Sequence, residues 1–383
     1  MDAKAAAREA IESRRAALVG LSHRIHAHPE LAFEEEKASA WCAEALADAG
    51  FEVEKPFCGL PTAFRARAGS GPLHVAFCAE YDALPGIGHA CGHNVIATMA
   101  LGAAMAAARV ADDVGLTVTV VGTPAEEHGG GKIVLLERGA FEGQHLAMMV
   151  HPSPVDAEQF PAIACCNLEI EYTGKSAHAA AFPQLGVNAL DALTVAQTSI
   201  GLLRQHIDPS DRLHGIVLHG GDAPNVVPAR TTARWLVRSR TLERLNDLIP
   251  RVRNCFEAGA LATGAKLALE ASAPYAEMRS EAALDALYRR NATDLGRSFP
   301  DLGGAAAAFA GSTDMGNVSL ALPSIHPLIG IDSLPAVPHQ PEFAAAARTP
   351  SADRAVFDGG LAMAWTAIDV ARDDALRARF IRG

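Results

Sequence analysis

The sequence predicts an α/β fold in which a domain with a mostly parallel sheet is interrupted by an inserted α+β domain. Its 383 residues suffice for two domains, and 49% hydrophobic residues can fill sizeable cores. The first 150 residues alternate short apolar runs with helical patterns, whereas apolar and polar residues alternate after Cys166. We therefore expect residues 1–166 and 278–383 to form the main domain and residues 167–277 to form the insert.

Short apolar runs predict the buried strands of the main domain. They occupy residues 73–79, 116–121 and 146–150, and an alanine-rich helix pattern over residues 96–110 follows the first of them. Apolar strands that alternate with helices are typical of a parallel sheet covered on both faces. A further helix pattern covers residues 351–372.

The residue pattern of the insert predicts a small antiparallel sheet with helices. Alternating residues predict half-exposed strands, and longer amphipathic stretches predict helices. The expected elements are a strand at 167–173, a helix at 186–206, strands at 214–219 and 231–239, and a helix at 243–262. This order indicates an independently folded unit of ordinary domain size.

Composition excludes several classes of partner and location. The net charge is -11 and no basic stripe is present, which argues against nucleic acid or an anionic membrane as the main partner. The first residues lack the apolar core of a secretory signal, and apolar windows end before the roughly 20 residues of a membrane span. Seven scattered cysteines argue against a disulfide framework, so we expect a cytoplasmic protein.

A thiol and two imidazoles lie within five residues, from His89 through Cys91 to His93. Thiolate and imidazole are ligands that zinc-like ions accept, and Gly92 allows the backbone to bend so that both side chains face one ion. The alternative is a turn with solvated histidines and a buried free thiol. Taken alone, this segment leaves both interpretations open.

Two adjacent carboxylates, Glu126 and Glu127, follow the second predicted strand. One could bind a metal while the other takes a proton from water. Acidic residues also favour helix N-termini, and for this pair alone that alternative is the commoner one.

Three histidines are unremarkable one by one. His151 follows a predicted strand, His178 lies in a loop of the insert, and His339 lies in a turn-rich region. Together, however, the sequence offers five metal ligands of suitable hardness beside Glu126 as a base. The five ligands are Cys91, His93, Glu127, His151 and His339.

With this set the chain resembles the dinuclear metallo-aminoacylase and carboxypeptidase-G family, which includes acetylornithine deacetylase. Within it, the chain is similar to the amidohydrolase branch of plant auxin-conjugate hydrolases and bacterial p-aminobenzoyl-glutamate hydrolase. Almost the whole chain takes part. The segments that carry the resemblance are residues 28–31, 79–85, 88–93, 123–127, 174–178, 224–228 and 338–339.

The resemblance implies two divalent metal ions, zinc or manganese, in a metallopeptidase-type catalytic domain. Cys91 would bridge the ions, His93 and His151 would complete one site, and Glu127 and His339 would complete the other. A thiolate bridge favours zinc, whereas imidazole and carboxylate accept either metal.

The resemblance also implies roles outside the ligand set. Glu126 would be the base and Asp82 would orient ligands. The insert would be a lid and dimerisation domain, from which His178 and Asn225 reach the oxyanion in a neighbouring subunit's site. Arg238 is similar in position to an arginine that binds substrate carboxylate, although a solvated charge on a strand is an equal alternative.

Two departures from the family pattern narrow the substrate. The first histidine of the usual His-x-Asp is replaced by Glu80, two residues before Asp82, and the group ending in His93 substitutes for it. Asn94 stands where auxin-conjugate hydrolases usually carry aspartate. Asn94, together with residues 129–131 and 312–316, favours the aminobenzoyl-glutamate and dipeptidase side of the branch and argues against an auxin-type substrate.

The expected reaction is metal-assisted hydrolysis of the amide bond of an N-acyl amino acid or small dipeptide. The resemblance to this family also implies a homodimer. One alternative is a metal-free amidase with Cys91 as nucleophile, activated by His93 or His89. The other is a non-catalytic binding protein with the same fold. A thiol enzyme has no need of the remaining ligands, and a binding protein has no need of Glu126.

Overall fold

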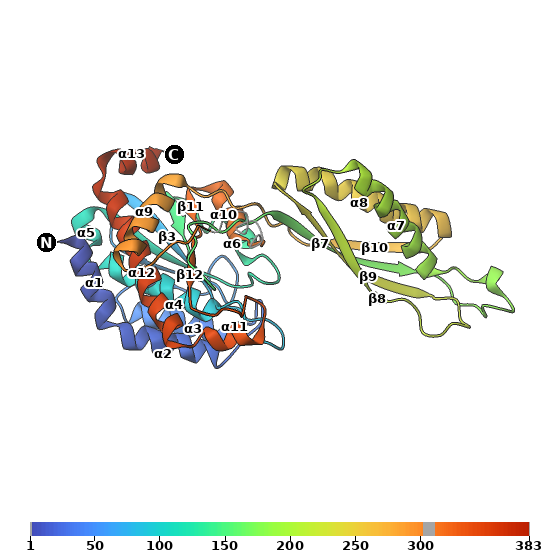
Figure 1. The fold of residues 1–383 in the computed structure, drawn as a ribbon, viewed down its shortest axis with the longest axis horizontal. Helices are drawn as coiled ribbons and strands as arrows, with labels where there is room; N and C mark the ends of the chain where they lie inside the picture. Colours follow the sequence, from blue (N-terminus) through green and yellow to red (C-terminus); the bar gives the residue numbers. More distant parts are fainter. Residues whose placement is uncertain (1, 302–310, 383) are drawn as a thin grey trace. The chain divides into compact units, whose positions relative to one another are not determined.

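The computed structural model describes residues 2–301 and 311–382, and it divides into two compact units. Unit 1 comprises Met1–Pro161 and Met278–Gly383, and unit 2 comprises Ala162–Glu277. Figure 1 shows the course of the chain through both units.

Unit 1 is built on a mostly parallel sheet, as the sequence predicts. Strand β3 pairs in parallel with β4 and β5, and β5 pairs in parallel with β11, while β2 runs antiparallel to β4 and to β1. The order across the sheet is β1 (Glu52–Glu54), β2 (Phe64–Ala68), β4 (Leu116–Thr123), β3 (Leu73–Glu80), β5 (Leu146–Met148) and β11 (Ser324–Ile325). The central strands β3 and β4 are buried on both faces, which explains their apolar sequences.

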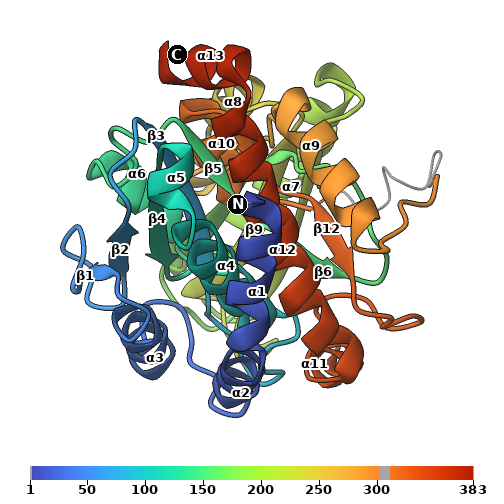
Figure 2. The ribbon, with the colours of Figure 1, turned by 90° about the vertical axis from the view of Figure 1, so that its left-hand side faces the viewer.

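Helices cover this sheet, and α4 (His93–Ala108) is its central helix, buried along almost its whole length. It packs against α12 (Pro350–Arg372), and α1 (Ala3–Ser13) and α2 (Arg15–His26) also contact it. Figure 2 shows α1, α4 and α12 side by side. The other helices of unit 1 are α3 (Glu36–Ala47), α5 (Ala111–Val114), α6 (Gly131–Glu137), α9 (Ala282–Asp294), α10 (Met315–Ala321), α11 (Pro341–Ala346) and α13 (Asp374–Arg382).

The third predicted strand, at residues 146–150, is divided in the structure. After β5 the chain enters β6 (His151–Ser153), which pairs in parallel with β12 (Leu328–Gly330) as a separate two-stranded sheet. The His151 amide donates to the Pro327 carbonyl at 3.0 Å. His151 therefore begins a strand of its own beyond the edge where β5 ends.

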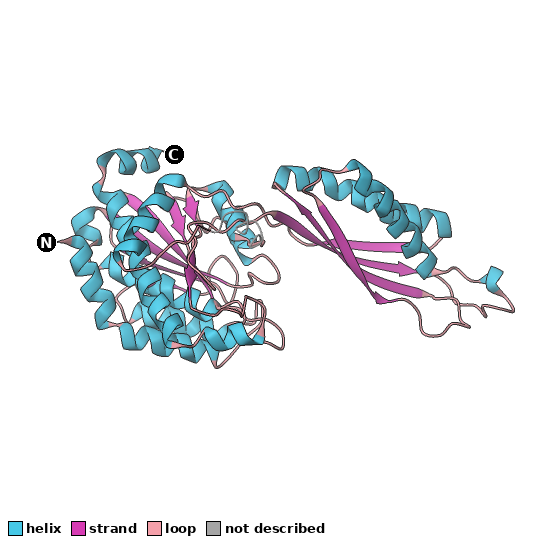
Figure 3. Ribbon diagram, in the orientation of Figure 1, coloured by secondary structure: helices cyan, strands magenta, loops and turns pink. Residues whose placement is uncertain are grey.

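Unit 2 has one four-stranded antiparallel sheet with two long helices on one face (Figure 3). The strand order is β10 (Lys266–Ala271), β7 (Ala164–Thr173), β9 (Arg230–Ser239) and β8 (Arg212–His219). The helices α7 (Ala189–Leu203) and α8 (Leu242–Thr263) pack on each other, and short 3-10 turns lie at Pro183–Leu185 and Arg204–His206. The sequence analysis missed only β10 among these strands, a largely exposed edge strand.

No helix among the described residues is both long and apolar enough to cross a membrane.

Candidate metal centre

The loops that leave β3 and β4, together with the start of α4, carry most of the predicted ligands. Gly92 precedes the first turn of α4 with a φ of 79°, and a Cβ there would come within 2.5 Å of Pro152 Cγ. Glycine is therefore required by both the backbone conformation and the space. It lets the chain turn between Cys91 and His93, which is the first residue of α4.

The structure brings all five predicted ligands together, in two groups that share one sulfur atom. Cys91, His93 and His151 form one group, and Cys91, Glu127 and His339 form the other. Within each group the potential ligand atoms lie within 4.8 Å of one another. Cys91 Sγ lies 3.4 Å from His151 Nε2, and Glu127 Oε1 lies 3.5 Å from His339 Nε2.

Asp82 is buried next to the ligands and forms hydrogen bonds with two of them, His93 and Glu127. Its Oδ1 accepts a hydrogen bond from His93 Nδ1 at 2.9 Å, and its Oδ2 accepts one from the Glu127 amide at 2.9 Å. Burial opposes ionisation of Asp82, but the charge and hydrogen bond of His93 outweigh it and lower its pKa. With Nδ1 engaged, His93 presents Nε2 to the ligand cluster, the arrangement that orients metal-binding histidines.

Glu126 lies beside the ligands and outside the two groups that share Cys91, although with Glu80 and His93 it forms a third group of potential ligand atoms. Its Oε2 is 4.0 Å from His93 Nε2, and the residue is only 8% exposed. Burial first, and then the charges of Glu80 and Glu127, raise the pKa of Glu126 well above its usual value. A nearby divalent cation would favour the ionised carboxylate that a base requires.

His151 is suited to bind metal in its neutral form. Its Nδ1 lies 2.7 Å from the Pro152 carbonyl, and Phe160 stacks on its ring at 6.3 Å. Burial, followed by the nearby His93, lowers the pKa of His151 to about 4. Protons therefore do not compete for Nε2 near neutral pH.

A buried charge cluster adjoins the ligands, and the sequence analysis missed it as a unit. Lys132 Nζ pairs with Glu80 Oε1 and with Asp314 Oδ1, and all three side chains are fully buried. The other oxygen of Glu80 lies 3.4 Å from His93 Nε2. Nothing in the pattern around Lys132 signals a buried charge, because its partners lie 52 and 182 residues away.

His326 is a second group that the sequence analysis missed. It follows β11, is buried, and has its ring centroid 5.7 Å from that of His151 and 5.1 Å from that of Phe160. Burial and the neighbouring His151 lower the pKa of His326, so the ring is neutral. Its position after a sheet strand was the signal that could have singled it out.

The residues present fit divalent metal ions. Among the buried atoms of the described residues that have no hydrogen-bond partner, three belong to this cluster: Glu80 Oε2, His93 Nε2 and Glu127 Oε1. Five carboxyl groups with side-chain exposures of 10% or less lie around His93 and Lys132, and Glu80 and Asp314 among them form ion pairs with the buried Lys132 ammonium; the five are Glu80, Asp82, Glu126, Glu127 and Asp314. Cations would offset this excess of buried negative charge, and the mixture of sulfur, imidazole and carboxylate suits zinc and related ions.

The three remaining predicted residues belong to unit 2. His178 and Asn225 are exposed and lie on paired segments, since the Ala179 amide donates to the Asn225 carbonyl at 3.0 Å. His178 Nδ1 accepts from the amides of Ala180 and Ala181, so its Nε2 carries the proton and can donate. Arg238 is half-buried on β9.

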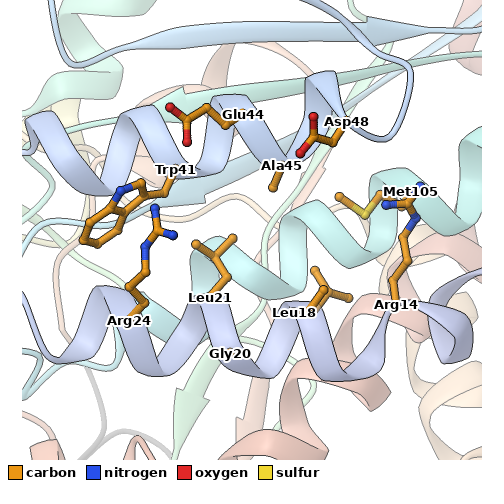
Figure 4. A pocket seen from close by; sticks show the side chains of 11 residues that line it. Arg14, Leu18, Gly20, Leu21, Arg24, Trp41, Glu44, Ala45, Asp48 and Met105 are labelled. Carbon is orange, nitrogen blue, oxygen red and sulfur yellow. The ribbon is translucent and has the colours of Figure 1, made fainter.

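A cavity of about 340 Å³ lies elsewhere in unit 1, between α2, α3 and α4 (Figure 4). The Arg24 guanidinium covers the Trp41 ring there, 3.8 Å from its centroid. No predicted site residue lines this cavity.

Comparison with known proteins identifies the family. The profile of Peptidase family M20/M25/M40 matches residues 76–349. The chain belongs to this family. It is 39% identical to the Xaa-Arg dipeptidase of Mus musculus over 384 residues, which cover 96% of this chain and 88% of the relative.

Two further proteins are similar to most of the chain. One of the subunits of the p-aminobenzoyl-glutamate hydrolase of Escherichia coli (strain K12) is 34% identical, over 67% of this chain and 57% of the relative. A crystal structure from Bacillus subtilis, described as a dinuclear metal binding peptidase of this family, superposes with a TM-score of 0.68 and 19% identity, covering 94% of this chain and 99% of that one.

Membership of the M20 family confirms the resemblance and the fold class predicted from the sequence, and makes this chain a metal-dependent amidohydrolase. The metal-free thiol mechanism is disfavoured by the site as well. Burial and the charge of Glu127 raise the pKa of the Cys91 thiol well above its usual value, which is the reverse of what a thiolate nucleophile needs.

Proposed function

We propose that this M20 enzyme hydrolyses dipeptides or N-acyl amino acids with two divalent ions bound around Cys91. The observation that carries the proposal is that Cys91 belongs to both ligand groups. Cys91, His93 and His151 would hold one ion, and Cys91, Glu127 and His339 the other. Bound there, the ions would polarise the scissile carbonyl and lower the pKa of water.

Glu126 is the base in this mechanism. It takes a proton from the attacking water and passes it to the leaving amine. Asp82 keeps His93 in the tautomer that offers Nε2 and fixes the backbone at Glu127. Burial and the neighbouring carboxyl groups raise the pKa of Glu126, which favours its taking up the proton. Positive charge from bound ions would lower that pKa and help Glu126 to pass the proton on.

His178 and Asn225 donate hydrogen bonds to the developing oxyanion, and Arg238 binds the substrate carboxylate. The protonated Nε2 of His178 supports the first role, because an oxyanion needs a donor. The pairing of the two segments within unit 2 supports a joint role for His178 and Asn225.

The enzyme works as a homodimer in which unit 2 of one chain serves the site of the other. The edge strand β8 supports this proposal. Among the described residues β8 pairs with β9 alone, and it exposes three consecutive apolar residues, Ile216, Val217 and Leu218. An exposed apolar edge strand is a template for pairing with another chain.

Seven free cysteines also suit a reducing, cytoplasmic location.

Zinc or manganese would fill the sites, and dipeptides with a C-terminal cationic residue are the first substrates to test. Near-complete coverage of the Xaa-Arg dipeptidase supports this choice over aminobenzoyl-glutamate, whose hydrolase aligns over a smaller part of the chain.

The test is a hydrolysis screen of chelator-treated enzyme, with zinc or manganese added back, on Xaa-Arg dipeptides, N-acyl amino acids and aminobenzoyl-glutamate. Elemental analysis before treatment should give two divalent ions per chain. Full activity in a metal-free, chelator-treated enzyme would refute the proposal.

A further inference from the structure

Glu35 is a fully buried carboxyl group that lies outside both ligand groups. It precedes the first residue of α3. Burial first, and the negative charge of Asp82 second, raise the pKa of Glu35 to about 7, so ionising it costs the folded state free energy. Burying a polar group costs free energy unless a hydrogen bond compensates for the lost contact with water.

That hydrogen bond reaches the segment carrying the base. Glu35 Oε1 accepts from the Ala125 amide at 2.8 Å, across 90 residues of sequence. Ala125 has a φ of 61°, a left-handed conformation that residues with a Cβ rarely adopt. Such a conformation persists where neighbouring contacts impose it. The Ala125 carbonyl is fixed too, accepting from the Gly131 amide at 3.2 Å.

The amide on the other side of Glu126 is held in the same way. The Glu127 amide donates to Asp82 Oδ2 at 2.9 Å, so buried carboxyl groups bind the amides immediately before and after Glu126. The two anchors differ in what else they hold. Asp82 also binds the side chain of the predicted ligand His93. Glu35 belongs to neither ligand group, and it accepts a hydrogen bond from the backbone amide of Ala125.

The loop that carries Glu35 is itself fixed at both ends. The Glu30 carbonyl accepts from the Ala83 amide at 2.8 Å, next to Asp82. The Glu30 carboxylate accepts from the amides of Lys37 and Ala38 in the first turn of α3. Glu35 therefore acts from a defined position.

We propose that Glu35 is a positioning residue that fixes the backbone before Glu126 and thereby aims the Glu126 carboxylate. The proposal rests on the proposed role of Glu126 as base. Since the Glu127 amide is held by Asp82 and not by Glu35, losing Glu35 should disturb the base more than the metal ligands. A misplacement of about 1 Å in a catalytic group can cost about 10²-fold in rate.

The experiment compares substitutions of Glu35 in the metal-loaded enzyme. Glu35→Ala should lower kcat by about 10²-fold, while KM and the metal content by elemental analysis stay unchanged. Glu35→Gln keeps an oxygen that can accept from Ala125 and should restore most of kcat. Glu34→Ala, which removes an exposed neighbouring carboxylate, is the matched control and should leave kcat unchanged. If thermal unfolding shows that Glu35→Ala does not fold, Glu35→Asp replaces it, since its shorter side chain withdraws the acceptor.

The outcomes separate this proposal from the proposed function. Wild-type kcat in Glu35→Ala, or in its substitute Glu35→Asp, beside an inactive Glu126→Gln refutes positioning by Glu35 and leaves the base intact. Equal losses in the Ala and Gln variants, or a loss of metal that matches the loss of kcat, also refute it. Full activity in Glu126→Gln would refute the role of Glu126 as the base, and both proposals would fail with it.

Discussion

The two units of the chain present their candidate functional residues in opposite ways. In unit 1 the groups are buried or nearly so apart from His339, whose side chain is 57% exposed, and Asp82 holds both His93 and the backbone of Glu127. In unit 2 His178 and Asn225 are exposed on loops. Pre-organised, buried ligands suit a metal centre that must not rearrange, whereas exposed donors suit groups that meet the substrate only when it is bound. Substitutions in the two units should therefore separate metal binding from turnover.

The largest effect is expected at Glu126, the one proposed catalytic group of unit 1 that is not a ligand. Glu126→Gln should lower kcat by about 10²–10⁴-fold, the usual contribution of a general base, with the metal content unchanged. Glu127→Gln, one residue away, should instead lose metal. Steady-state kinetics and elemental analysis of both variants check this, and a Glu126→Gln enzyme that keeps most of its kcat contradicts the assignment.

In unit 2, His178→Ala should lower kcat by about 10²–10³-fold, the cost of one oxyanion donor. The variant should still bind metal normally, because unit 1 holds every predicted ligand. Mixing it with Glu126→Gln under subunit exchange should restore activity, since one site of the mixed dimer then combines an intact Glu126 with the partner subunit's His178. Demonstrated exchange without recovery would show that His178 does not act across subunits.

Metal removal should destabilise unit 1 and leave unit 2 unaffected, because only unit 1 gains binding free energy. A ligand at 100 times its Kd stabilises the native state by about 2.7 kcal/mol. Calorimetry with and without chelator, compared with the same experiment on Cys91→Ser, checks this. A chelator-induced shift of the same size in the Cys91 variant would place the stabilising metal elsewhere.

The smallest expected effect is a pH-dependent difference in stability at Glu35. Its pKa is about 7 in the fold and 4.5 in the reference state, so the folded protein favours the protonated form. The stabilisation from Glu35 is complete below pH 4.5 and is lost progressively as the pH rises to about 7. Relative to Glu35→Gln, the wild-type Tm should therefore fall between pH 5 and 7 and then level off. Glu34→Gln, an exposed control, should show no such trend.

The sequence predicts the central strands well because burial on both faces leaves continuous apolar runs, as in β3 and β4. It fails for β10, a short edge strand in which only Leu267 and Leu269 are partly buried. The sequence predicts one strand at 146–150, whereas in the structure β5 ends at Met148 and a separate strand, β6, begins at His151.

Within the candidate site, the ligand types could be predicted because each follows a strand or a turn and suits a metal chemically. The helix-terminus alternative for Glu126 and Glu127 does not hold in the structure, since α6 begins only at Gly131. Lys132 and Glu35 could not be predicted, because their importance comes from partners far away in sequence. Tertiary contacts of that kind leave no local pattern.

The sulfur of Cys91, common to both ligand groups, has a consequence for how the proposed centre fills. Burial keeps the pKa of the Cys91 thiol well above its usual value, so the free protein holds a proton there. The first ion to bind must displace that proton, whereas the second meets a thiolate already formed. Occupancy of one position should therefore strengthen the other, and in a titration the singly loaded protein should remain a minor species at every metal concentration.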